Sequence, residues 1–131
     1  RLLADARVTQ FEGLNARHLT PELIAPALDV PLDLVVGDVS FISLTLVLPA
    51  LRSVLPLGGL LLFLVKPQFE LQPGQVGKGG IVRDESLYAV VEQRIRDCCV
   101  ALGLEVRAWI DSPIQGGDGN REFFVHARRA A

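Results

Sequence analysis

The chain has 131 residues, enough for one domain, and half of them are hydrophobic, so this length allows a sizeable core. Its 13 basic and 15 acidic residues give a formal net charge of −2, which excludes a global electrostatic attraction to nucleic acid or to an anionic membrane. Any contact with nucleic acid must come from a local patch or from residues outside this chain.

Three further features of the sequence indicate the compartment of the protein and argue against a metal site and a membrane span. Cys98 and Cys99 fall within a helical pattern, which predicts small core residues of a protein in a reducing, cytoplasmic compartment. His18 and His126 lie far apart without another cysteine or histidine at ligand spacing, so no metal site is predicted. An arginine, two prolines and a glycine pair interrupt the apolar residues 44–65, which favours a helix, a turn and a buried strand over a membrane span.

The first third of the chain predicts two strands with a short helix between them. Residues 7–13 form the first predicted strand. A loop and a short helix follow over residues 15–24, with Thr20 as N-cap and Pro21 at the first helical position. Residues 32–41 form the second strand, whose near-continuous apolar run is typical of a parallel sheet covered on both faces.

The remaining pattern predicts, in chain order, a helix, a strand, a glycine-containing loop, a helix and two strands: residues 43–55, 59–66, 67–83, 87–102, 104–111 and 121–129. Pro49 predicts a kink or a late start of the first helix, Asp84 or Ser86 caps the second, and Gly103 ends it. A loop without a helix, residues 112–120, joins the last two strands. We therefore predict an α/β fold with a partial Rossmann-like sheet, mostly parallel with an antiparallel last strand, as in class I methyltransferases.

Three ionisable residues are predicted to converge at one edge of this sheet. Asp38 follows the apolar run "LVVG" and Lys66 follows "LLFLV", near the carboxyl ends of the two predicted strands, where ligands of open α/β sheets bind. Glu122 lies at the beginning of the last strand, which faces the same edge if that strand is antiparallel. The alternative is an ion network that carries no chemistry.

Four motifs carry a resemblance to a known family. They are "DLVVGDVSFISL", "LVKPQFE", "GKGGIVRD" and "SPIQGGDGNREF", and they are spread over most of the segment 32–126. In this order they resemble the TlyA/hemolysin A family, whose catalytic domain is FtsJ-like. The resemblance implies an S-adenosylmethionine-dependent methyltransferase that acts on ribose 2′-hydroxyls of ribosomal RNA, with ribosomal RNA as partner and no membrane association.

The resemblance also implies catalytic residues. FtsJ-like enzymes use a Lys-Asp-Lys-Glu tetrad, and by motif Asp38, Lys66 and Glu122 match its last three members. The first lysine, the glycine-rich cofactor loop and an S4-type RNA-binding domain are expected before residue 1. We therefore expect residues 1–131 to be the C-terminal part of one methyltransferase domain, inactive and with little cofactor affinity on its own.

Further positions are expected to contact the cofactor and the RNA. Asn15 matches the position that meets the adenine edge, while Asp38 and Val39 are expected near the methionine end; an asparagine in a turn is the alternative for Asn15. Lys78 and Arg83 are candidates for RNA phosphate contacts, with a solvated surface loop as the alternative. "GQVGKGG" is no nucleotide-binding P-loop, because a glycine follows its lysine.

Lys66 has two possible roles in this chemistry. It can accept the hydroxyl proton as a general base, or orient the hydroxyl and stabilise the developing oxyanion. Two nearby carboxylates favour the charged amine whereas burial opposes it. We favour the orienting and electrostatic role.

Two other functions and one assembly state stay open. The chain fits a non-catalytic Rossmann-like module that binds RNA or protein, or a small-molecule methyltransferase of the same fold, and the upstream sequence would discriminate among them. If the first strands are absent, the strand over residues 32–41 has an open edge. We then expect residues 7–13 to pack elsewhere, or this edge to form a homo-oligomer.

Overall fold

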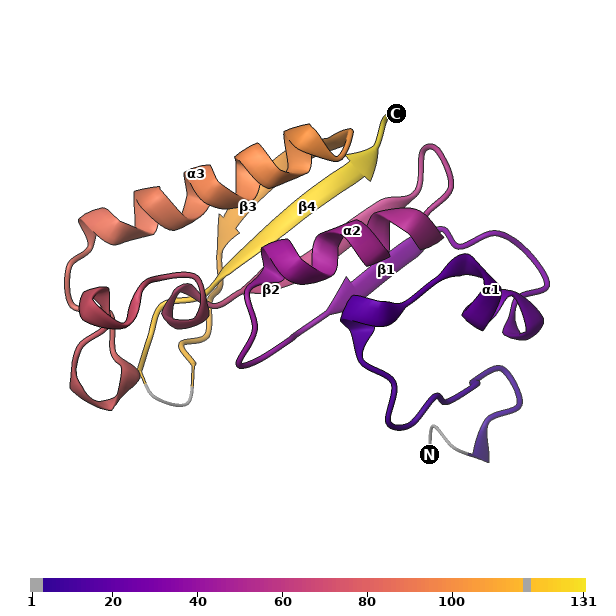
Figure 1. Cartoon of the computed structure of the whole chain (residues 1–131), viewed down its shortest axis with the longest axis horizontal. Helices are drawn as coiled ribbons and strands as arrows, with labels where there is room; N and C mark the ends of the chain where they lie inside the picture. The colour runs from indigo at the N-terminus through magenta and orange to yellow at the C-terminus, as the bar shows by residue number, and fades with distance from the viewer. Residues whose placement is uncertain (1–3, 117–118) are drawn as a thin grey trace.

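A mixed four-stranded sheet forms the centre of the computed structural model, which describes residues 4–116 and 119–131 (Figure 1). The strands lie in the order β1-β2-β4-β3, with bounds Leu34–Gly37, Leu60–Val65, Phe123–Arg129 and Leu104–Asp111. β1 pairs with β2 in parallel, and β4 runs antiparallel to both β2 and β3. This confirms the predicted α/β fold, in which β4 alone among these strands opposes the common direction.

Two long helices, α2 (Leu44–Val54) and α3 (Ser86–Ala101), cross the same face of the sheet and contact each other (Figure 1). The residues of β2 that face them, Leu61, Phe63 and Val65, are buried, and the alternate residues are half-buried. The expectation that helices cover both faces is therefore wrong for the described residues. A continuous apolar run indicates that a strand is buried, but it does not indicate which elements cover each face of the strand.

Helical spacing explains both helices. On α2 the residues Leu44, Val47, Leu48 and Leu51 point into the core, and each such buried side chain contributes roughly 1.5–3 kcal/mol. Pro49 lies inside α2 on its exposed side, and the helix begins at Leu44, so the predicted late start is wrong.

The second helix keeps its predicted apolar spacing, but the predicted cap at Asp84 or Ser86 is wrong, because the N-cap is Glu85 and its side chain makes no capping hydrogen bond. On α3 the buried residues Val91, Ile95 and Cys99 recur every four positions. Burial raises the pKa of the Cys99 thiol to about 12, as expected for a core residue, and both cysteines are free thiols. Gly103 follows the helix with a φ of 70°, a left-handed conformation that glycine adopts without strain.

The N-terminal part is mostly irregular and contains short helices: η2 (Ala16–His18), α1 (Pro21–Ile24) and η3 (Ala25–Ala27). Thr20 caps α1 as predicted, its hydroxyl accepting from the Leu23 amide at 3.3 Å. The strand predicted over residues 7–13 is absent, because these residues pair with no strand of the sheet. A segment with strand-forming residues becomes a strand only where a sheet edge pairs with it.

Residues 67–83 form a long connection with three short 3-10 helices: η4 (Pro67–Phe69), η5 (Pro73–Gln75) and η6 (Lys78–Gly80).

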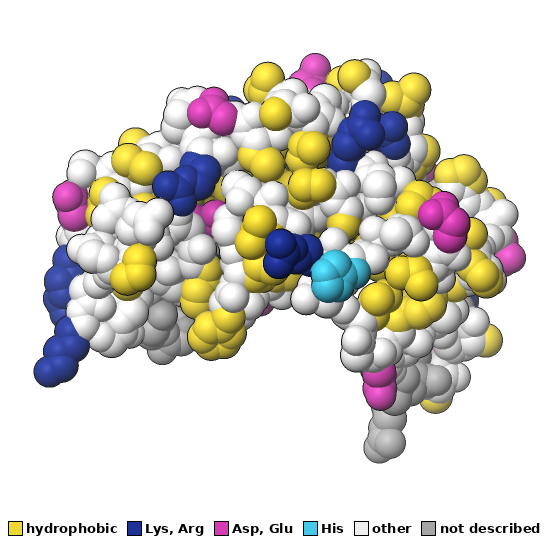
Figure 2. Space-filling model, in the orientation of Figure 1, with side chains coloured by type: hydrophobic (Ala, Val, Ile, Leu, Met, Phe, Trp, Pro, Cys, Tyr) yellow, Lys and Arg dark blue, Asp and Glu magenta, His cyan; other side chains and the backbone are white. Residues whose placement is uncertain are grey.

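In the orientation of Figure 1, the lower outline of the molecular surface is concave, and positive side chains are scattered over the face toward the viewer (Figure 2). Among the described residues, no helix is both long and apolar enough to cross a membrane.

Candidate functional site

Lys66 and Asp38 meet where two parallel strands end. Lys66 directly follows β2 and Asp38 directly follows β1, so both lie at the carboxyl edge of the sheet. Lys66 Nζ lies 2.6 Å from Asp38 Oδ1 and donates to Ser40 Oγ at 2.8 Å. The lysine side chain is only 15% exposed whereas Asp38 is 58% exposed. The pair therefore places a held positive charge beside an accessible carboxylate.

The strand register directs Glu122 to the same edge. The register ends with Phe123 of β4 paired to Val65 of β2, and Glu122 and Lys66 are the residues next to this last pair. Glu122 is half-buried, and its carbonyl oxygen accepts from the Ser112 amide at 2.8 Å. The expected strand start at residue 121 shifts to Phe123, so Glu122 lies in the loop end that enters β4.

A charged and aromatic cluster fixes the backbone beside Glu122. The Arg121 guanidinium donates to Asp111 Oδ2 at 2.7 Å and lies over the rings of Tyr88 and Phe123, at 4.9 and 5.2 Å from their centroids. Such cation–π contacts contribute roughly 0.5–1 kcal/mol at exposed sites. Arg121 thereby joins β3, α3 and β4 immediately before Glu122.

Asn120 joins the loop over residues 112–120 to the connection over residues 67–83. Its side chain, 1% exposed, accepts from the Val82 amide at 2.9 Å and donates to the Gly80 carbonyl at 2.7 Å. Lys78 and Arg83, both exposed, lie on the connection that Asn120 holds. The sequence predicts that the loop "SPIQGGDGN" packs near the loop "GQVGKGG" and positions Glu122, and the Asn120 contacts confirm that the two loops meet. Residues 117 and 118 of the predicted loop 112–120 lie outside the described residues.

Glu70, the last residue of "LVKPQFE", was not interpreted from the sequence. It is buried and caps α2, its carboxylate accepting from the Ser43 hydroxyl at 2.6 Å and the Leu44 amide at 2.7 Å. Burial raises the pKa of Glu70, while Ser43, Leu44 and the nearby Arg94 act in the opposite direction. Arg94 also donates to the Glu70 carbonyl, which ties α3 to this turn.

The structure does not join Asn15 directly to the Asp38–Lys66 pair. Asn15 Oδ1 accepts from the Arg17 amide at 2.9 Å and so caps η2, as the turn alternative expected. Arg17 and Phe41 line a hollow of about 560 Å³ where η2 meets the start of α2. Val39, next to Asp38, is half-buried against the hydrophobic core.

Phe41 is a candidate site residue that the sequence reasoning missed. Its side chain is 89% exposed, and its backbone has a φ of 61°, a left-handed conformation that is uncommon outside glycine. The ring contacts the Phe69 ring, with centroids 5.0 Å apart and planes inclined by 50°. An aromatic residue just after the polar end of a strand was the available signal, since Phe41 directly follows Ser40.

Comparisons with known proteins show the family of the chain. The profile of the family described as FtsJ-like methyltransferase matches residues 1–129. The 16S/23S rRNA (cytidine-2′-O)-methyltransferase TlyA of Mycobacterium tuberculosis is 44% identical over 124 residues, which cover 95% of this chain and 45% of TlyA. Hemolysin A of Brachyspira hyodysenteriae is 34% identical over 126 residues, covering 96% of this chain and 51% of that protein.

Solved structures support the same fold. A protein from Streptococcus thermophilus described as a hemolysin superposes with a TM-score of 0.90 at 41% identity, covering 98% of this chain and 46% of that one. A SAM-dependent methyltransferase from Methanosarcina mazei, at 11% identity and a TM-score of 0.52, shares the fold alone, covering 89% of this chain and 65% of that one. The chain spans about half the length of the curated relatives it matches. With a profile match over nearly its whole length, the chain belongs to the FtsJ-like methyltransferase family.

Proposed function

We propose that the protein containing this chain transfers a methyl group from S-adenosylmethionine to a ribose 2′-hydroxyl of ribosomal RNA. The observation that carries the proposal is Lys66, held between Asp38 and Ser40 at the carboxyl edge of the sheet. Glu122 directly precedes Phe123, which pairs with Val65, the residue before Lys66. Membership of the FtsJ-like family and the RNA named for TlyA support the reaction and the substrate class.

The contacts of Lys66 suit an orienting role. An ammonium group has three hydrogens, and Lys66 directs two of them at Asp38 and Ser40, which leaves the third for a substrate oxygen. That hydrogen bond orients the 2′-oxygen and stabilises the negative charge that develops as the oxygen attacks. A carboxylate at the same edge, Asp38 or Glu122, receives the hydroxyl proton.

The residues at this edge fit S-adenosylmethionine, which when bound supplies an electrophilic methyl group. The Asp38 carboxylate is more than half exposed and complements the positive charge of a sulfonium. Asn15 is exposed, and its carboxamide nitrogen can donate to an adenine edge while its oxygen caps η2. Val39 presents its backbone beside Asp38.

Two basic residues and one aromatic residue are proposed to contact the RNA. Lys78 and Arg83 are exposed on the connection tethered by Asn120, where they can neutralise phosphates. Phe41 offers an exposed ring beside the Lys66 pair, and RNA-modifying enzymes commonly stack unpaired bases on such rings.

Removal of the Lys66 amine tests the proposal. In the protein at its natural length, we expect Lys66→Ala to lower transfer of labelled methyl from S-adenosylmethionine to ribosomal subunits at least 100-fold, because a positioned charge is lost from the reacting oxygen. Affinity for S-adenosylmethionine, measured by calorimetry, should survive.

Arg107→Ala, an exposed change on β3, is the matched control and should leave transfer unchanged. Alkaline hydrolysis of the RNA should yield a resistant dinucleotide, which identifies a 2′-O-methyl group. Undiminished transfer by Lys66→Ala would overturn the role of Lys66. Methylation of small molecules without RNA, or RNA binding without transfer, would overturn the proposed reaction.

A further inference from the structure

Two turns lie next to each other at the carboxyl edge of the sheet, and each carries part of the proposed site. The Asp38 turn, residues 38–43, leads from β1 into α2, and the Lys66 turn, residues 66–70, leaves β2 through η4. Because β1 and β2 are parallel neighbours, both turns start from the same edge. The contacts between the two turns therefore decide where the charges of the site lie.

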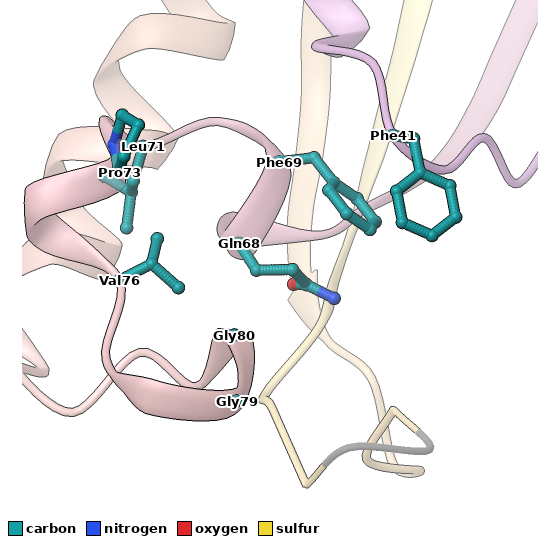
Figure 3. Close-up of a pocket in the computed structure, with 8 residues that line it drawn as sticks. All are labelled: Phe41, Gln68, Phe69, Leu71, Pro73, Val76, Gly79 and Gly80. Carbon is teal, nitrogen blue, oxygen red and sulfur yellow. The ribbon is translucent and has the colours of Figure 1, made fainter.

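Two of these contacts involve residues already assigned to the site. Lys66 Nζ lies 2.6 Å from Asp38 Oδ1 and 2.8 Å from Ser40 Oγ. The rings of Phe41 and Phe69 meet with their centroids 5.0 Å apart, and Figure 3 shows them side by side at the edge of a cavity of about 370 Å³. Both contacts join the Asp38 turn to the Lys66 turn.

A third contact, made by Glu70, joins the far ends of the two turns. The buried carboxylate accepts from the Ser43 hydroxyl at 2.6 Å and from the Leu44 amide at 2.7 Å, through different oxygens. The backbone carbonyl of Glu70 accepts from Arg94 of α3. Glu70 thus fixes the Lys66 turn to the beginning of α2, and α3 holds Glu70 in place.

The backbone at Phe41 explains why the Asp38 turn depends on this third contact. Its φ of 61° is a left-handed conformation, which is costly outside glycine and persists only where the surrounding structure enforces it. Ser40, just before it, is held by Lys66. Ser43, two residues after it, is held by Glu70. If the Glu70 contacts are removed, the turn can relax at Phe41, and this relaxation moves Ser40 away from Lys66.

We propose that Glu70 is a positioning residue for Lys66, because its hydrogen bonds to Ser43 and Leu44 hold the turn that carries the partners of the ammonium group. The inference rests on the proposed function, in which the ammonium group must point at the reacting oxygen. Glu70 is 3% exposed, so it acts on the reaction through the Asp38 turn and not by contact with a substrate.

Two changes at Glu70 separate its hydrogen bonds from its charge. Glu70→Met keeps the length of the side chain but removes both acceptors, which leaves the buried Leu44 amide without this partner. Glu70→Gln keeps one acceptor oxygen for that amide, and its nitrogen can donate to the Ser43 hydroxyl. Glu92→Met, the same change at a carboxylate of α3 that pairs with Arg96, is the matched control.

Nitrogen NMR of the lysine ammonium groups, in the protein at its natural length, measures how firmly Lys66 is held. The loss of one resonance in Lys66→Ala identifies its signal. A hydrogen-bonded ammonium group exchanges its hydrogens with water slowly, and we expect Glu70→Met to raise the exchange rate of Lys66 about tenfold. Glu70→Gln and Glu92→Met should change this rate less than about twofold.

Methyl transfer is the second measurement. At saturating ribosomal subunits and S-adenosylmethionine, kcat should fall about tenfold in Glu70→Met and recover in Glu70→Gln, at a temperature where circular dichroism shows each variant folded. Ser43→Ala removes one of the two contacts from the other turn and is the milder change. It should move the exchange rate and kcat in the same direction by a smaller factor, and it decides the question if Glu70→Met does not fold.

An unchanged exchange rate of Lys66 in the folded variants Glu70→Met and Ser43→Ala would overturn the inference. An equal rise in Glu92→Met, or no rescue by Glu70→Gln, would also overturn it. If the unchanged protein methylates RNA while Lys66 exchange is independent of Glu70, this inference fails and the proposed function stands. If the unchanged protein methylates no RNA but Lys66 exchange depends on Glu70, the proposed function fails and Glu70 still positions Lys66.

Discussion

At Phe41 both the backbone and the side chain are in unfavourable states. A left-handed conformation costs a residue other than glycine roughly 1–3 kcal/mol, and the 89% exposed ring gains little burial in return. The surrounding turn, where Ser40 contacts Lys66 and Ser43 caps α2, holds the residue in place. Folding alone does not account for an aromatic ring in this position, whereas contact with a ligand does.

We expect Phe41→Ala to separate stability from function. The free energy of unfolding, measured by urea denaturation, should change by less than about 1 kcal/mol, because the substitution removes an exposed ring without altering the core. Methyl transfer to ribosomal subunits should fall at least tenfold, because a base loses its stacking surface. Leu57→Ala, at another exposed apolar residue, is the control for both measurements. An unfolding change above about 3 kcal/mol, or full transfer activity, would contradict the prediction.

For single residues, the sequence predicts which side chains lie at the ends of strands better than it predicts which turn and loop residues contact them. Asp38 and Lys66 follow two apolar runs, and parallel pairing alone brings them together. Ser40, Glu70 and Asn120 could not be found in the same way. Their contacts depend on how turns and loops fold back, which no periodicity records.

Among the elements, α2 depends on a residue from another part of the chain. Glu70, which follows η4, accepts from the first amide of α2 and from its N-cap Ser43. The amino end of a helix carries a partial positive charge, so the ionised carboxylate is favoured there by contact and disfavoured by burial. The raised pKa of Glu70 shows that burial has the larger effect.

A pH dependence follows from this balance. A carboxyl group whose pKa rises on folding above its ordinary value of 4.5 binds its proton more tightly in the folded state. Its contribution to the free energy of unfolding is then fully present below 4.5 and decreases as the pH rises through the folded pKa. For Glu70→Gln, which removes this titration, the free energy of unfolding should therefore increase relative to the unchanged protein as pH rises from about 4 to about 7.

Urea denaturation at a series of pH values measures this difference. Glu105→Gln, the same change at an exposed position of β3, is the control. A difference that stays constant, or that decreases toward neutral pH, would show that burial does not dominate at Glu70.

The elements also show where patterns are sufficient. The heptad-like spacing of α3 and its terminal Gly103 fix that helix almost to the residue. Residues 7–13 are predicted as a strand but form none, because strand formation depends on a pairing partner as well as on local sequence. The bounds of a regular helix could be predicted from the sequence, but the elements that pack on each face of the sheet could not.

For the whole molecule, the edge strand β1 is the main exposed structural feature. β1 pairs only with β2 among the described residues, and Leu34 and Val36 on it are 49% and 62% exposed. An unpaired apolar edge is a template for pairing with another chain.

We expect the 131-residue chain to self-associate as its concentration rises, as sedimentation velocity measures. Val36→Lys should suppress the association, because a charged side chain on an edge strand opposes pairing. Ile114→Lys, at an apolar residue that is 74% exposed but lies away from this edge, should leave it unchanged. A chain that stays monomeric at every concentration would contradict the prediction.

The hydrogen bonds of Asn120 between two loops limit how the lengths of these loops can change during evolution. The Asn120 carboxamide links its own loop to the connection over residues 67–83, where it accepts a hydrogen bond from the Val82 amide and donates one to the Gly80 carbonyl. An insertion in the turn between β3 and β4 would displace Asn120 and leave the buried Val82 amide and the partly buried Gly80 carbonyl unpaired. The two loops are therefore expected to change length together, as one inherited unit, so that a new surface on these loops requires paired alterations about 40 positions apart.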